Sequence, residues 1–143
     1  MFKNFDDFEP KYFIDFSKEL HDSRQSFNSN STVNRVIYGR IYYGTFLYVR
    51  EWLKKYWGYN STTKDHTKMI NFIRSRGSFG FITNTKIADD LELLKKLRHQ
   101  SDYFITIPNK GTEEYSKWIF ESIDDAFNIA QSTINYVDEI EVP

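Results

Sequence analysis

The side chains best suited to chemistry lie in the run 97–103, which reads Leu-Arg-His-Gln-Ser-Asp-Tyr. Arg98 follows Leu94 by four residues, so a helix here carries its guanidinium on the same face as a core leucine. Asp102, one turn later, would form a structural ion pair with it. Alternatively, Arg98 borders a cleft and holds a phosphate. The polar neighbours that would share this cleft are His99, Ser101 and Tyr103.

Other reactive arrangements are missing from the sequence. There is no cysteine, which excludes disulfides, thiolate catalysis and cysteine-bound zinc. His21, His66 and His99 are far apart, and none stands at a ligand spacing from another histidine or a carboxylate. The phosphate-binding P-loop and the Gly-x-Ser-x-Gly nucleophile motif are also absent. The sequence therefore predicts neither a metal site nor a cofactor.

The length and composition are those of one globular domain. The chain has 143 residues, and we expect a single core and a single domain over residues 1–143. Aromatic residues make up 18%, which predicts a bulky core and leaves aromatic surface for a partner. No apolar run reaches the roughly 20 residues of a membrane span, and the first ten residues lack a signal-peptide core. We therefore expect a cytoplasmic protein that does not enter a membrane.

Charge is distributed unevenly along the chain. Residues 33–76 contain nine basic and two acidic residues, whereas residues 111–143 contain one basic and eight acidic residues. The basic segment fits the footprint of a polyanion, because neutralising phosphates releases counterions. The alternative is a basic helix that faces the acidic C-terminal helix of the same chain.

Helical periodicity dominates the middle of the chain. Prolines occur only at positions 10, 108 and 143, so no obligate helix breaker lies between residues 11 and 107. The segment Thr32–Trp57 carries two apolar stripes, which places it at the centre of a bundle. The residues of the first stripe are Ile37, Ile41, Gly44, Tyr48 and Trp52. Those of the second are Val36, Tyr43, Leu47 and Leu53.

Shorter periodic segments predict the remaining helices. A helix over Phe8–Ser23 is marked by the series Tyr12, Phe16 and Leu20. A helix over Asp65–Arg76 turns Met69, Ile70 and Ile73 inward and ends at Gly77. Thr85 is the expected N-cap of a helix that buries Ile87, Leu91, Leu94 and Leu97.

The last helix is expected to begin at Thr112 and to continue through Ile119 and Ile123 to Val137. Glu113 and Glu114 suit its positively polarised first turn. Sustained alternation with hairpin turns is absent, which argues against an all-β fold. The sequence therefore predicts an all-α antiparallel bundle of four to five helices.

Three motifs in order resemble the HEPN domain (higher eukaryotes and prokaryotes nucleotide-binding), in its small stand-alone prokaryotic form. Residues 40–46 read Arg-Ile-Tyr-Tyr-Gly-Thr-Phe, which matches the Arg-x-Tyr-Tyr motif of the long helix. His66 matches the histidine that usually opens the next helix. Residues 94–103 match a Leu-x-x-Leu-Arg-x-x-Ala/Ser-Asp-Tyr pattern. The resemblance covers roughly residues 34–140.

The resemblance implies a homodimeric helical bundle with RNA-directed or nucleotide-linked roles in toxin-antitoxin or phage-defence systems. It implies a site around Arg98, with His99 and Tyr103 in the catalytic positions. The residues expected to bind substrate beside them are Arg40, Tyr43, His66, Ser101 and Asp102. Many HEPN ribonucleases carry a histidine where this chain has Tyr103, whose ordinary pKa near 10 makes it a poor base at neutral pH.

Three functions follow as hypotheses. The first is a non-catalytic or weakly catalytic HEPN-like module that binds RNA, a nucleotide or a partner such as a nucleotidyltransferase antitoxin. The second is a metal-independent endoribonuclease toxin that uses Arg98 and His99. The third is a helical scaffold in which Arg98 and Asp102 are only an ion pair.

Overall fold

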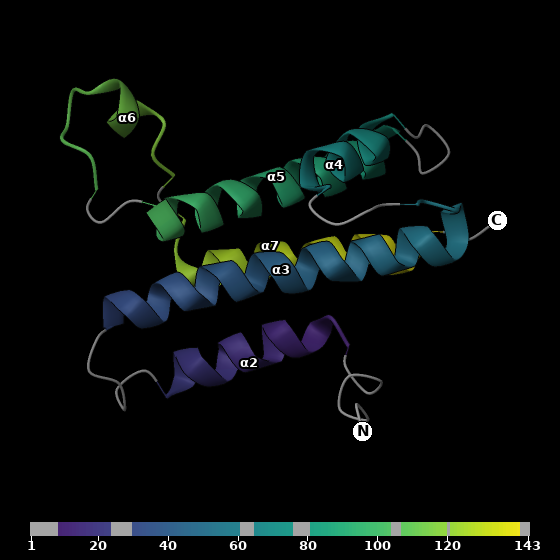
Figure 1. Ribbon diagram of the computed structural model, residues 1–143, viewed down its shortest axis with the longest axis horizontal. Coiled ribbons are helices and arrows are strands. Elements are labelled where there is room, and N and C mark those ends of the chain that lie inside the picture. Colours follow the sequence, from purple (N-terminus) through teal and green to yellow (C-terminus); the bar gives the residue numbers. More distant parts are fainter. Residues whose placement is uncertain are drawn as a thin grey trace.

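The computed structural model describes residues 9–23, 30–60, 65–75, 81–103, 107–119 and 121–140. Every regular element within these ranges is a helix, which confirms the all-α prediction, although the six helices found there exceed the predicted four to five (Figure 1). The elements in chain order are α2 (Lys11–Asp22), α3 (Asn30–Trp57), α4 (His66–Arg74), α5 (Phe81–Tyr103), α6 (Glu113–Ser116) and α7 (Ile123–Glu139). Over the same ranges, no helix combines the length and the apolar character needed to cross a bilayer.

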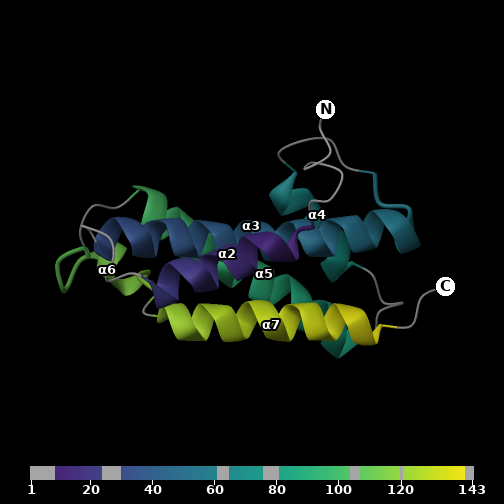
Figure 2. The ribbon, with the colours of Figure 1, turned by 90° about the horizontal axis from the view of Figure 1, so that it is seen from below.

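Helix α3 is the central element, as its two apolar stripes predict. It packs against α2, α5 and α7: Figure 1 shows it between α2 and α5, and Figure 2 shows α7 running alongside it. Ile37, Ile41 and Leu53 on this helix are fully buried. The helix ends where Gly58 takes a positive φ of 65°, a conformation that favours glycine.

Helix α2 crosses α3 at Gly44. A Cβ at this position would lie 2.8 Å from Cγ1 of Ile14 and 3.0 Å from the carbonyl oxygen of Pro10, so only a glycine allows this approach. The contact turns Ile14 into the core. Tyr12 and Phe16 lie about 200° away on the helix and are 49% and 48% exposed, whereas Leu20, the third residue of the predicted series, packs against the core, so only part of the series is buried. Phe8, the predicted start, lies outside the described residues.

Helices α4 and α5 bury the residues predicted for them. The buried side chains are Met69, Ile70 and Ile73 on α4, and Ile87, Leu91, Leu94 and Leu97 on α5. The prediction of Thr85 as an N-cap is wrong, because α5 begins one turn earlier, at Phe81. The buried Asn84 donates from Nδ2 to the carbonyl of Arg74 at 3.1 Å, which ties this first turn to the end of α4. Arg76 and Gly77, the predicted end of α4, lie outside the described residues.

The C-terminal helix is divided, contrary to the prediction. Thr112 caps α6, but α7 begins separately at Ile123, behind a capping box in which Ser122 and Asp125 bond each other's backbone amides. The Gln100 side chain holds the backbone of Ile119 outside a helix: its Oε1 accepts from the Ile119 amide at 2.7 Å, and its Nε2 donates to the Ile119 carbonyl at 3.0 Å.

Candidate functional site

Arg98 lies near the C-terminal end of α5, where its side chain is partly accessible. Its Nε donates to Oδ2 of Asp102 at 3.2 Å, and the two side chains are 30% and 38% exposed. The guanidinium carbon also lies 4.7 Å from the ring centroid of Tyr43 and 5.8 Å from that of Tyr42. The structure therefore contains the predicted ion pair, but at the surface, and adds an aromatic support from α3.

His66, the first residue of α4, faces the same tyrosines. Its ring stacks on Phe46 with centroids 4.1 Å apart and meets the edge of Tyr43 at 5.9 Å. Burial lowers the pKa of His66, and the nearby charges of Arg98, Lys95 and Arg50 lower it further. The imidazole is therefore neutral at pH 7.

A hydrogen bond between the Tyr42 hydroxyl and Nδ1 of His66 orients the imidazole. Tyr42 is fully buried, and burial raises the pKa of its hydroxyl, so this group stays protonated. Within the described ranges its hydroxyl has no other partner, so we assign its proton to Nδ1. The neutral imidazole then carries its own proton on Nε2, which has no hydrogen-bond partner in the same ranges. His66 is therefore an N–H donor through Nε2.

Lys95 brings another positive charge to this place, one turn before Arg98 on α5. Its Nζ donates to Oγ1 of Thr67 at 2.9 Å, which links α5 to the start of α4. Lys95, His66 and Thr67 line an open depression of about 480 Å³ together with Asp65, Lys68 and Asn71. We call Arg98, Lys95, His66, Tyr42 and Tyr43 the Arg98 cluster.

The remaining predicted site residues make their contacts elsewhere. The His99 ring packs against Tyr103, with centroids 4.7 Å apart, and Tyr103 is 71% exposed. Ser101 donates to the carbonyl of Leu97 at 2.9 Å. The guanidinium of Arg40 lies 5.2 Å from the ring centroid of Phe13 on α2.

Of the eight predicted site residues, the structure thus brings together Arg98, Asp102, Tyr43 and His66. The sequence analysis missed Lys95 and Tyr42. The spacing of Lys95 and Arg98 is a usable signal, because residues three apart on a helix are neighbours. The signal for Tyr42 is its place as the first tyrosine of the Arg-x-Tyr-Tyr motif, although a tyrosine on a central helix is most simply a core residue.

Comparisons with known proteins leave the family open. Neither a protein-family model, nor a curated protein, nor a solved structure matches this chain. Among the described residues, no three histidine, aspartate or glutamate side chains are grouped so that they could hold a metal ion.

Proposed function

We propose that this protein is a HEPN-like module that binds RNA or a nucleotide through the Arg98 cluster, with weak or no catalysis. The observation that carries the proposal is the state of the Arg98 guanidinium. Its Nε and its flat side are engaged by Asp102 and Tyr43, whereas Nη1 and Nη2 have no hydrogen-bond partner within the described ranges. These two nitrogens form the pair of donors that binds a phosphate in a bidentate manner.

The neighbours of Arg98 support an anion rather than a neutral ligand. Lys95 adds a second fixed positive charge, and His66 offers an N–H donor from Nε2. An arginine already held by a ring and a carboxylate loses little side-chain freedom when it binds a phosphate. Single-stranded RNA and free nucleotides both present phosphates next to bases that stack on aromatic or guanidinium groups.

The same cluster argues against efficient cleavage of RNA. A base is needed to activate the attacking 2'-hydroxyl, and His66 is the histidine that belongs to the Arg98 cluster. Its Nδ1 is occupied by Tyr42 and its Nε2 carries the proton, so it cannot accept one. His99 packs against Tyr103, and this pair is the remaining basis for the endoribonuclease alternative.

The proposal is tested by RNA and nucleotide binding to the full chain, measured by fluorescence anisotropy at several salt concentrations. We expect Arg98→Ala to weaken binding about tenfold and to lower the salt dependence by about one phosphate contact. Lys96→Ala is the matched control, because it removes an exposed charge about 200° away on the same helix. Equal binding by wild type and Arg98→Ala would rule the proposal out.

Catalysis is tested separately with purified protein, labelled RNA and a metal chelator. We expect little or no cleavage, and we expect Tyr103→His to raise it by adding a titratable group near pH 7. Rapid cleavage by the natural sequence, abolished by His99→Ala, would instead favour the endoribonuclease toxin.

A role in a toxin-antitoxin or phage-defence system, with a nucleotidyltransferase-type antitoxin as partner, is part of the same proposal. The competing hypothesis is a helical scaffold, which predicts no RNA or nucleotide affinity at any salt concentration. The binding experiment therefore separates the two.

A further inference from the structure

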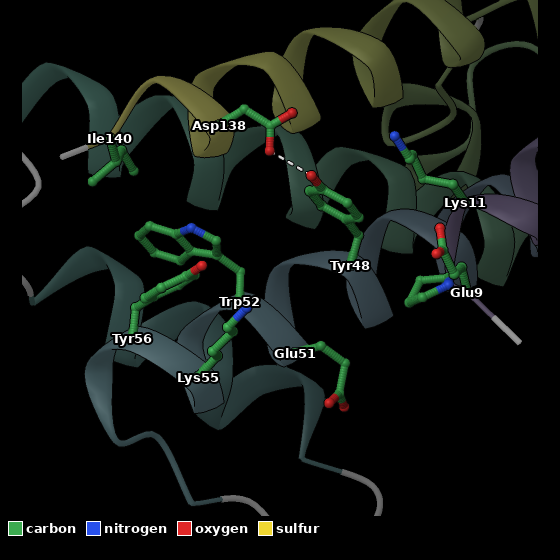
Figure 3. A pocket seen from close by; sticks show the side chains of 10 residues that line it. Glu9, Lys11, Tyr48, Glu51, Trp52, Lys55, Tyr56, Asp138 and Ile140 are labelled. Atoms are coloured by element: carbon green, nitrogen blue, oxygen red, sulfur yellow. Dashed lines mark hydrogen bonds between the residues drawn. The ribbon is translucent and has the colours of Figure 1, made fainter. Parts of the chain in front are cut away.

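An open groove of about 630 Å³ lies where the end of α3 meets the start of α2 and the end of α7 (Figure 3). Its volume is in the range of small-molecule sites. Tyr48, Trp52 and Tyr56 of α3 form its aromatic side, at four-residue steps along one face. Tyr48 follows Tyr43 by five residues, which places it about 140° around the helix from the Arg98 cluster. The groove is therefore a separate feature.

The aromatic side offers a surface for a planar ring. The ring centroids of Trp52 and Tyr56 lie 5.9 Å apart at an angle of 54°. Figure 3 shows the two rings next to each other, with Ile140 from the end of α7 close by. Both rings are partly exposed, so a flat ligand can exclude water from them on binding.

Two lysines supply positive charge along the same groove. The Nζ of Lys11 lies 5.7 Å from the ring centroid of Tyr48, and that of Lys55 lies 5.1 Å from the centroid of Tyr56. Over the described ranges, neither ammonium group has a carboxylate within ion-pair distance. Their charges are therefore available to a ligand.

Two of the three carboxylates in the groove have a partner within the described residues, but only Glu51 is paired with a cation. Asp138 accepts a hydrogen bond from the Tyr48 hydroxyl, whose pKa is raised to about 12 by burial and by this bond, so it stays protonated. Glu51 lies 3.4 Å from Nη2 of Arg50. Glu9 is the third carboxylate, at the same end of the groove as Lys11.

We infer that this groove binds a planar aromatic anion of about nucleotide size, whose ring packs on Trp52 and Tyr56 and whose acidic group is held by Lys55, with Lys11 adding positive charge at the other end of the groove. A cationic ligand is disfavoured, because the rings of Tyr48 and Tyr56 already carry ammonium groups. The inference uses no residue of the Arg98 cluster and does not depend on the function proposed for it.

The test is a titration of the full ¹⁵N-labelled chain followed by the indole N–H signal of Trp52, which Trp52→Phe identifies. Adenosine monophosphate and indole-3-acetate represent the two sources of such an anion, a nucleotide and an aromatic carboxylic acid. We expect a saturable shift of the Trp52 signal with at least one of them. The ligand that binds more tightly shows whether the groove prefers a phosphate or a carboxylate. Adenosine lacks the acidic group and inorganic phosphate lacks the aromatic ring. Each should therefore bind at least about tenfold more weakly.

Variants of exposed residues show whether the lysines are responsible. Lys55→Ala should weaken binding about tenfold, as expected for loss of a charged partner, and Lys11→Ala should weaken it less, because Lys11 lies at the other end of the groove. Lys54→Ala, an adjacent exposed lysine outside the groove lining, and Arg98→Ala should leave the affinity unchanged. No shift of the Trp52 signal with either anion, or a larger shift with the cation spermidine, would overturn the inference. So would full affinity in both groove-lysine variants.

Discussion

At the residue scale, only part of the Arg98 guanidinium is engaged by other side chains. Nε pairs with Asp102 and the flat side lies over Tyr43, while Nη1 and Nη2 have no hydrogen-bond partner over the described ranges. A structural ion pair and a phosphate-binding role are thus compatible, because they use different nitrogens. The contribution of the ion pair to the free energy of unfolding can be measured separately.

We expect Arg98→Ala to lower the free energy of unfolding by about 1 kcal/mol or less, because partly exposed ion pairs and cation–π contacts contribute little. A fully buried pair would instead lose about 3 kcal/mol or more. Urea unfolding of the variant and of wild type at pH 7 measures the difference. Asp102→Ala should show a similarly small change, and a large loss in either would contradict the partly exposed geometry.

Asp90 is a buried carboxyl between α5 and α7. It is 5% exposed and lies 3.1 Å from Nζ of Lys86 and 3.4 Å from Oγ1 of Thr133. Burial raises the pKa of Asp90 above its ordinary 3.8, and these two partners offset only part of that effect. The folded state therefore holds the Asp90 proton more tightly than the unfolded state.

This raised pKa predicts a specific pH dependence. The stabilising contribution of the Asp90 proton is complete below pH 3.8 and is lost as the pH rises through the folded-state pKa. We expect Asp90→Asn, which stays neutral and can keep the bond to Thr133, to gain stability relative to wild type as the pH rises through this range. Urea unfolding of both proteins from pH 4 to pH 7 measures the difference. A difference that is constant or shrinks with pH would contradict the assignment.

At the scale of helices, Gly44 sets the distance between α2 and α3. The space that a Cβ would need is occupied by Ile14 and by the backbone of Pro10, and backbone cannot move aside cheaply. Gly39 lies on the same helix, five residues earlier, and a Cβ there would meet nothing within 4 Å. The two glycines therefore form a matched pair.

We expect Gly44→Ala to destabilise the protein by about 1 to 3 kcal/mol, because α2 must shift away from α3. Gly39→Ala should instead stabilise it by about 0.5 to 1 kcal/mol, because alanine favours the helix. Thermal unfolding of both variants tests the contrast. Equal effects of the two substitutions would mean that α2 does not depend on this contact.

At the scale of the whole molecule, the described ion pairs do not join the basic segment (residues 33–76) to the acidic segment (residues 111–143). Within the described ranges, the ion pairs of residues 33–76 run to carboxylates of residues 51–92, such as those of Arg74 with Asp89 and Glu92. The C-terminal acidic residue Asp124 instead lies 3.2 Å from Nε2 of His21. Over the described residues, these ion pairs of the basic segment are therefore made with parts of the chain other than α7.

We also propose a homodimer, through α3 around Arg40, Tyr43 and Leu47 and the segment that ends at Tyr103. Tyr103 and Val36 are exposed apolar side chains in these parts of the chain. Light scattering should give about twice the 17.2 kDa of one chain.

Val36→Asp should shift this dimer toward monomer, because it places a charge in the apolar contact. The control is Phe16→Asp, which charges an exposed aromatic on α2, and it should leave the mass unchanged. A wild-type monomer at micromolar concentration would contradict the dimer.

The sequence by itself determined the helical class, the central place of α3 and the buried faces of α4 and α5. These features follow from local periodicity, since a run of apolar residues at helical spacing specifies both the helix and the side it must bury. The same reasoning marked Arg98, because a charge on an apolar face is anomalous whatever the tertiary structure.

Only the tertiary structure decided which side chains join Arg98 and which long-range contact holds Ile119 outside the last helix. His66 reaches the cluster because α4 packs on α5, and Gln100 interrupts the last helix from nineteen residues away in the sequence. The buried face of α2 likewise depends on its contact with Gly44 rather than on its own apolar series. Local periodicity cannot report such features, because each depends on a contact between residues far apart in the chain.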